Sequence, residues 1–165
     1  MDKQIIKFSE HKDIMSKLCR DVIISCWRPD YVVGITRGGL LPAVMISHYL
    51  EVPCKSLDVS LRDGGDLVSN FGIAEDAFNG KKILLVDDIN DSGNTFNWIM
   101  QDWPFGCCSG DPKWARVWND NVRFAVVVDN LSSKCKVKMD YTGIEVNKAE
   151  HDVWITFPWE EWWTR

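Results

Sequence analysis

At 165 residues, with 45% hydrophobic and 26% charged side chains, the chain has the size and composition of one ordinary globular domain. Its formal net charge of −5 argues against a nucleic-acid-binding protein, whose affinity would depend on basic side chains, although backbone amides could still hold a small phosphorylated ligand. No apolar run approaches the roughly 20 residues that span a bilayer. The first residues do not resemble a signal peptide, so we expect a cytoplasmic protein with no membrane partner.

Helical and strand patterns alternate along the chain. Ile14, Leu18 and Val22 recur every four residues and predict an amphipathic helix. Ser9 is its candidate N-cap, and the helix should end before Pro29. The other predicted elements are strands over 31–35, about 53–60, 83–86, 124–128 and 142–146, and helices over 40–50 and about 94–103. This alternation implies an α/β fold with a mostly parallel central sheet flanked by helices.

No repeat or linker divides the chain, so we expect a single domain over residues 1–165. Its core should span about 31–147. The terminal segments, 1–30 and 148–165, would form a small hood beside that core. Residues 104–120 contain Pro, Gly, Cys and Trp, and we interpret them as an insertion to which the sequence assigns no function.

An apolar strand that runs directly into two carboxylates is the most informative feature. In open α/β sheets ligands bind beyond the carboxyl ends of the strands, so Asp87 and Asp88 would face such a crevice. The turn that follows opens a helix, and its free backbone N–H groups and hydroxyl side chains suit a phosphate dianion. Its residues are Asp91, Ser92, Gly93, Asn94 and Thr95. The segment therefore predicts a ribose 5-phosphate site, with carboxylates for sugar hydroxyls or a metal beside a phosphate cradle.

Each half of this segment also has an ordinary structural explanation. Aspartate often ends a strand, and serine or threonine often caps a helix. The acid pair would also suit a phospho-acceptor site of the receiver-domain type, but such a site needs no phosphate turn beside it. The segment contains neither G-x-x-x-x-G-K-[ST] nor G-x-G-x-x-G. The combination of acids and turn favours the sugar-phosphate site.

A second glycine turn lies upstream, between the strand over 31–35 and the helix over 40–50. It reads Thr36-Arg37-Gly38-Gly39. Its glycines would let successive amides converge on an anion, and Arg37 would add positive charge. A simple strand-to-helix connection could explain this turn alone. Together with the acidic segment, it favours a second phosphate-binding loop.

The two segments resemble the signatures of type I phosphoribosyltransferases. The run from Val86 to Thr95 is similar to that family's ribose phosphate motif, and residues 34–43 are similar to its pyrophosphate loop. The resemblance implies the type I phosphoribosyltransferase fold, 5-phosphoribosyl-1-pyrophosphate (PRPP) as donor, and a dimer or tetramer. It also implies Mg²⁺ bound by Asp87 and Asp88, directly or through water, and a cis peptide bond before Arg37.

Asp91 indicates the class of acceptor base. A 6-oxopurine that attacks through one imidazole nitrogen must lose a proton from the other, and a carboxylate is a suitable general base. Hypoxanthine–guanine and xanthine–guanine enzymes resemble this chain in having Asp there, whereas adenine and orotate enzymes usually carry a small or hydroxyl residue. The tail over 151–160 resembles that of bacterial xanthine–guanine enzymes. This implies that Trp154 stacks on the purine and that Ile155 offers backbone groups to its edge.

The chain departs from the family pattern at three places, of which the apparent insertion over 104–120 is one. Family enzymes that act on 6-oxopurines place a purine-contacting Lys at the end of the strand before the tail, where this chain has Asn130. Asn130 could donate through its amide, or Lys134 could reach back. The family's mobile loop carries Ser-Tyr, whereas here the polar, glycine-rich stretch that we interpret as that loop, 62–66, begins at Arg62. Arg62 is a candidate pyrophosphate contact or a solvated charge.

These observations predict a purine-salvage phosphoribosyltransferase that makes a nucleoside monophosphate and pyrophosphate. A related alternative uses another base, such as adenine or uracil. A more distant alternative is a non-catalytic regulatory protein that senses PRPP and binds RNA or DNA through a local basic patch, which the net charge of −5 does not promise.

Overall fold

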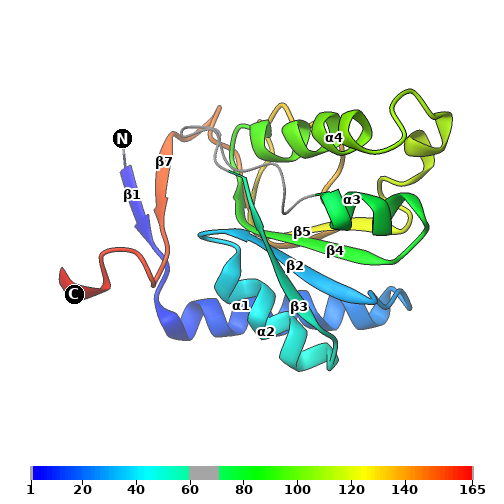
Figure 1. The fold of residues 1–165 in the computed structure, drawn as a ribbon. Helices are drawn as coiled ribbons and strands as arrows, with labels where there is room; N and C mark the ends of the chain where they lie inside the picture. Colours follow the sequence, from blue (N-terminus) through cyan, green and yellow to red (C-terminus); the bar gives the residue numbers. More distant parts are fainter. Residues whose placement is uncertain (1, 60–70, 165) are drawn as a thin grey trace.

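The structure is a computed structural model that describes residues 2–59 and 71–164. Among these residues, five parallel strands form the central sheet in the order β3-β2-β4-β5-β6 (Figure 1). The strands are β2 (Tyr31–Thr36), β3 (Cys54–Asp58), β4 (Ile83–Asn90), β5 (Val122–Asn130) and β6 (Tyr141–Val146). The expected α/β fold with a parallel sheet is confirmed.

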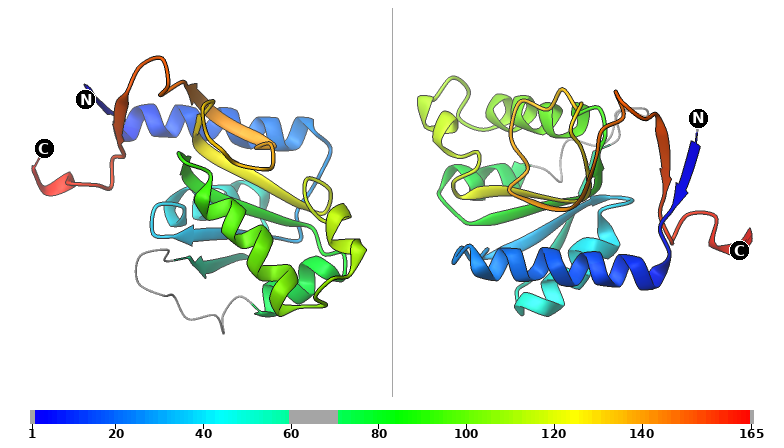
Figure 2. Two further views of the ribbon diagram at one scale, coloured as in Figure 1. Left: turned by 90° about the horizontal axis from the view of Figure 1, so that it is seen from above. Right: turned by 180° about the vertical axis from the view of Figure 1, so that it is seen from behind.

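Helices cover both faces of this sheet. α1 (Phe8–Ile24) and α2 (Leu40–Leu50) lie on one face, and α3 (Phe71–Phe78) and α4 (Asn94–Gly106) lie on the other (Figures 1 and 2). Each face has its own hydrophobic core. None of the helices in the described part of the chain is long and apolar enough to cross a membrane.

The central strand β4 supplies side chains to both cores. Leu84 and Val86 pack against the α1 and α2 side, whereas Ile83 and Leu85 pack against the α3 and α4 side. All four side chains are fully buried. Successive side chains of a strand point to opposite faces, so a strand buried on both faces must be apolar throughout. The prediction of a doubly buried strand is confirmed.

Some element boundaries differ from the predictions. β4 continues to Asn90 because its pairing with β5 extends to Asn90 and Asp129, so Asp87 and Asp88 lie within the strand and do not end it. α1 begins at Phe8 after Lys7, which caps it without a side-chain hydrogen bond, so Ser9 is not its N-cap. The helix α3 was not predicted.

The hood is a separate small sheet. β1 (Asp2–Ile5) pairs in parallel with β7 (Val153–Thr156), and both termini lie at this end of the molecule (Figure 2). The expected hood is built from about 1–30 and 148–165, but within the first of these segments α1 packs against the central sheet. Its side chains Leu18 and Val22 are fully buried there, because its apolar stripe needs a large apolar face to cover.

The segment 104–120 is part of the hydrophobic core on the α3 and α4 side. It contains the short 3₁₀ helix η2 (Pro112–Arg116), whose Trp114 is buried. The indole Nε1 of Trp114 donates to the carbonyl of Cys107 at 2.9 Å. Its ring stacks on Trp118 with 5.6 Å between ring centroids and packs against Phe78. The segment thus closes one end of the core.

Replacing Trp114 by alanine should lower the free energy of unfolding by about 3–5 kcal/mol, because it leaves a cavity where a large ring was buried. Phe105→Ala is the matched control, since that ring is 82% exposed in the same segment, and it should have an effect below about 0.5 kcal/mol. Urea unfolding of the two variants measures both effects. Equal effects would contradict a core role for this segment.

Candidate active site

The site lies where the chain changes direction across the sheet. From β2 the chain leaves to one side to form β3, and from β4 it leaves to the other side to form β5, while β2 and β4 are neighbours. Open α/β sheets bind ligands in the crevice that forms at such a point. Both predicted motifs begin in the carboxyl-terminal ends of these two strands and continue into the turns that follow. A side chain on Gly38 would overlap the carboxylate of Asp88, so the motifs are in direct contact.

The acid pair is held by local backbone hydrogen bonds. Asp87 Oδ1 accepts from the amide of Asp88 at 2.9 Å, and Asp88 Oδ1 accepts from the amide of Ile89 at 2.8 Å. Burial raises the pKa of Asp87 well above its ordinary value, and the neighbouring charge of Asp88 raises it further. Burial also raises the pKa of Asp88, to about 6. Two carboxylates held together in this way favour a bound cation or hydroxyl donors.

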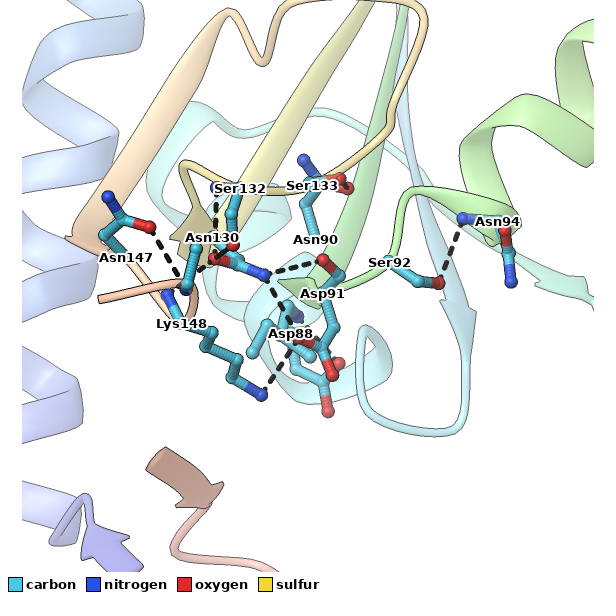
Figure 3. Close-up of polar contacts among 12 residues, drawn as sticks. Asp88, Asn90, Asp91, Ser92, Asn94, Asn130, Ser132, Ser133, Asn147 and Lys148 are labelled. Carbon is cyan, nitrogen blue, oxygen red and sulfur yellow. Dashed lines mark hydrogen bonds and ion pairs between the residues drawn. The ribbon is translucent and has the colours of Figure 1, made fainter. Parts of the chain in front are cut away.

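The turn after β4 encloses a small cavity of about 200 Å³. Its lining is the continuous run from Asp87 to Phe96, which includes Asp91, Ser92, Gly93, Asn94 and Thr95. Gly93 caps α4 with a positive φ of 86°, a backbone conformation that glycine adopts without strain. The Ser92 hydroxyl accepts from the amide of Asn94 at 3.3 Å (Figure 3). The first amides of α4 have no acceptor within the helix, so this cavity suits an anion.

A second segment supports this cradle from outside. A side chain on Gly93 would overlap the backbone of Cys135. The amide of Lys134 donates to the carbonyl of Ser92 at 3.1 Å. The side chain of Asn97 makes two hydrogen bonds to the same segment. Its Nδ2 donates to the carbonyl of Lys134 at 3.0 Å, and its Oδ1 accepts from the amide of Lys136 at 2.8 Å. Residues 134–136 thereby fix the shape of the turn.

A larger cleft of about 830 Å³ lies between the sheet edge and the hood. The sheet contributes Thr36, Arg37, Gly38, Asp87 and Asp88, and the hood contributes Trp154, Thr156, Trp159, Glu160, Glu161 and Trp163. Asp87 and Asp88 line both this cleft and the small cavity. The acid pair is therefore the junction between an amide-lined cavity and an aromatic cleft.

Of the four residues in the turn after β2 that were expected to bind pyrophosphate, only three line the cleft. The peptide bond between Thr36 and Arg37 is cis, as expected. Arg37 is exposed, and Gly38 lines the cleft beside it. Gly39, however, is buried, and its amide donates to the carbonyl of Ile35 at 2.9 Å. We therefore revise the expectation that Gly39 binds pyrophosphate, because its donor is used inside the turn. Arg62 and the loop 62–66 lie outside the described residues.

The hood presents alternate residues of β7 to the cleft. Trp154 is 55% exposed and lines the cleft, as does Thr156. The side chain of Ile155 points away and is buried in the core, so only its backbone could reach a ligand. Trp159 stacks on Phe157 with 5.0 Å between ring centroids.

The side-chain amide of Asn130 makes hydrogen bonds to other residues of the protein. It is buried at the end of β5, and its Nδ2 donates to the carbonyl of Asp91 at 2.9 Å. Its Oδ1 accepts from Ser132 Oγ at 2.8 Å and from the amide of Lys148 at 3.1 Å (Figure 3). We therefore revise the expectation that Asn130 binds the base, because its amide group is already engaged. Lys134 is exposed, and its backbone makes hydrogen bonds to Ser92 and Asn97.

Sequence reasoning missed Lys148. Its Nζ lies 2.9 Å from Oδ1 of Asp91, and its side chain is only 15% exposed. The available signal was its position: it lies two residues after Val146, the last residue of β6, and so at the same sheet edge as the two motifs.

The chain matches the family model of the phosphoribosyl transferase domain over residues 4–162. It is 30% identical over 141 residues to the xanthine-guanine phosphoribosyltransferase of Cereibacter sphaeroides, covering 81% of this chain and 70% of that protein. It is 29% identical over 146 residues to the same-named enzyme of Roseobacter denitrificans, covering 81% and 69%. The purine phosphoribosyltransferase structure from Pyrococcus horikoshii superposes with a TM-score of 0.67 at 26% identity, covering 98% of this chain and 96% of that chain. The chain therefore belongs to the phosphoribosyltransferase family.

Proposed function

We propose that this phosphoribosyltransferase moves ribose 5-phosphate from PRPP to a 6-oxopurine (guanine, xanthine or hypoxanthine) and releases pyrophosphate. The observation that carries the proposal is the position of Asp87 and Asp88, which line both the amide-lined cavity and the aromatic cleft. A sugar phosphate spans two such spaces, with its phosphate in one and its reactive carbon facing the other. The names of the relatives support a purine acceptor.

Each part of the donor has a matching surface. The 5′-phosphate would bind the amides and hydroxyls of the turn from Ser92 to Thr95, and the ribose hydroxyls would bind the acid pair. The pyrophosphate would bind at Thr36, Arg37 and Gly38, where the cleft has its exposed guanidinium group. The base would lie under the hood against Trp154, whose exposed ring offers an apolar stacking surface.

The residues of the site fit Mg²⁺ bound together with the substrate. Within residues 2–59 and 71–164 no group of three or more His, Cys, Asp or Glu side chains gathers as a metal site. Mg²⁺ commonly uses one or two carboxylates and takes its other ligands from water and substrate phosphates, a role that Asp87 and Asp88 could fill. A bound Mg²⁺ would offset the charge of the leaving pyrophosphate.

Asp91 would act as the general base. The base displaces pyrophosphate at the anomeric carbon, so a nitrogen–carbon bond forms as the carbon–oxygen bond breaks. The purine must then lose the proton from its other imidazole nitrogen, and Asp91 would accept it. The side chain of Asp91 is 49% exposed and lies at the cavity that begins with the acid pair. A carboxylate in this place is accessible to a bound purine and can accept its proton.

We infer further that the chain forms a homo-oligomer. Several apolar side chains are exposed on the outer surfaces of α1 and α2, which no part of the described chain covers. They are Ile23, Ile24, Leu41, Val44 and Tyr49. A second subunit would remove such side chains from water.

A panel of bases tests the proposed function. The protein is incubated with PRPP, Mg²⁺ and each of guanine, xanthine, hypoxanthine, adenine and uracil, and pyrophosphate release is measured. Turnover should be confined to 6-oxopurines. Asp91→Ala should reduce that turnover about 10²- to 10⁴-fold, the usual contribution of a general base.

Two results of the panel would contradict the proposal. Turnover with adenine or uracil alone would assign the enzyme to another base. PRPP binding without turnover on any base would favour the regulatory alternative.

Gly38→Ala should weaken PRPP binding with little loss of stability. The added methyl group would displace the Asp88 carboxylate, which our proposal places against the ribose. We expect KM for PRPP to rise at least about tenfold, the effect of losing one good polar contact of about 1.4 kcal/mol. Gly72→Ala is the matched control because a side chain there meets open space. Unchanged KM in Gly38→Ala would remove Asp88 from the donor site.

The kcat/KM for PRPP should fall as the pH falls below about 6. Burial raises the pKa of Asp88 to about 6, so its carboxyl gains a proton and loses its charge as the pH drops through that value. The pH dependence of kcat/KM reports the ionisation of the free enzyme. Asp88→Asn should lower kcat/KM throughout and abolish the step near this pH. If the variant keeps the step, another group is responsible.

A further inference from the structure

The carboxylate assigned as general base is paired with a lysine from a distant part of the chain. Lys148 Nζ lies 2.9 Å from Asp91 Oδ1 (Figure 3). The two partners differ in environment, because the lysine side chain is 15% exposed and that of Asp91 is 49% exposed. An ammonium ion so far removed from water needs an anionic partner, and removing that partner leaves an uncompensated charge. The lysine is therefore held in place and can restrain the more exposed carboxylate.

One buried amide connects the backbones of both partners. Asn130 Nδ2 donates to the carbonyl of Asp91 at 2.9 Å, and Asn130 Oδ1 accepts from the amide of Lys148 at 3.1 Å. Ser132 Oγ also donates to Asn130 Oδ1 at 2.8 Å, which fixes the orientation of the amide. The distance between the backbones of residues 91 and 148 is thus set by a group that is itself fully engaged. The ion pair is built into the frame of the site.

The contacts to the carboxylate of Asp91 fall on one of its oxygens. Lys148 contacts Oδ1, and Asn130 Nδ2 approaches the same atom at 3.5 Å. No hydrogen bond from another described residue reaches Oδ2 in this structure. One oxygen is therefore anchored while the other is left to interact with a ligand.

We propose that Lys148 is a positioning residue for Asp91: it anchors Oδ1, so that Oδ2 faces the base and accepts its proton. The inference rests on the proposed function. A carboxylate on an exposed turn samples several rotamers, whereas an anchored one is held in a single orientation before the base arrives. Lys148 acts through Asp91 and touches no reacting atom. The rate of the chemical step, and not donor affinity, should depend on it.

A double-mutant cycle tests this role with the 6-oxopurine that the unmodified protein uses best. Lys148→Met removes the charge but keeps an unbranched apolar side chain, and it should lower kcat about tenfold or more, a part of the general-base contribution. KM for PRPP should change less than about twofold, because the donor site is intact. Lys148→Arg should recover most of the rate, since it restores a cation at the same place. In the Asp91→Ala background, Lys148→Met should have no further effect on kcat.

The controls separate this inference from the proposed function. Lys12→Met removes an exposed lysine of α1 and should leave kcat unchanged. Equal losses from Lys148→Met with and without Asp91 would overturn the positioning role while leaving the function in place. A raised KM for the base with unchanged kcat would overturn it too, because Lys148 would then bind the base. If Lys148→Met does not fold, Lys148→Gln, which also removes the charge, decides by the same comparison in both backgrounds. Absence of turnover by the unmodified protein with every base would overturn both proposals.

Discussion

The pairing of β2 with β4 is the constraint on which the site depends. Their ladder ends at Gly34 and Val86, beyond which the two strands take different paths. β2 enters a turn and α2, whereas β4 continues beside β5 as far as Asn90. Gly39 packs so closely on the carbonyl of Val86 that any side chain there would overlap it. The turn is therefore pressed against the acid pair, and the two proposed phosphate-binding elements meet at one edge.

This arrangement buries two neighbouring carboxylates, which are unfavourable in their charged form unless a ligand is bound. Burial raises the pKa of both Asp87 and Asp88 because each carboxylate loses contact with water, and the charge of Asp88 raises the pKa of Asp87 further. The hydrogen bonds from the following amides offset only part of this cost. Such a pair is better suited to a ligand that brings a cation and hydroxyl groups than to the empty protein. Unfavourable local electrostatics of this kind are common at functional sites.

The parts of the molecule that could be predicted are those determined by short stretches of sequence. The apolar run from Ile83 to Val86 and the turns at Gly38 and Gly93 carry their own signals, since burial on two faces and close backbone approach each restrict residue type. β1 has no such signal, because its side chains are exposed and its pairing with β7 joins opposite ends of the chain. Lys148 was missed for the same reason, since its partner lies far away in sequence. The roles expected of Gly39 and Asn130 changed because hydrogen bonds inside the protein use their polar groups.

The support behind the proposed phosphate-binding turn has a consequence for how members of this family are compared. Residues 134–136 hold the turn at Ser92 and Gly93 through backbone contacts, and their own side chains follow no recognisable motif. Two relatives could therefore share every letter of the signature from Asp87 to Thr95 and still differ in donor affinity. During divergence, drift in this supporting segment could adjust that affinity while the signature itself remains unchanged.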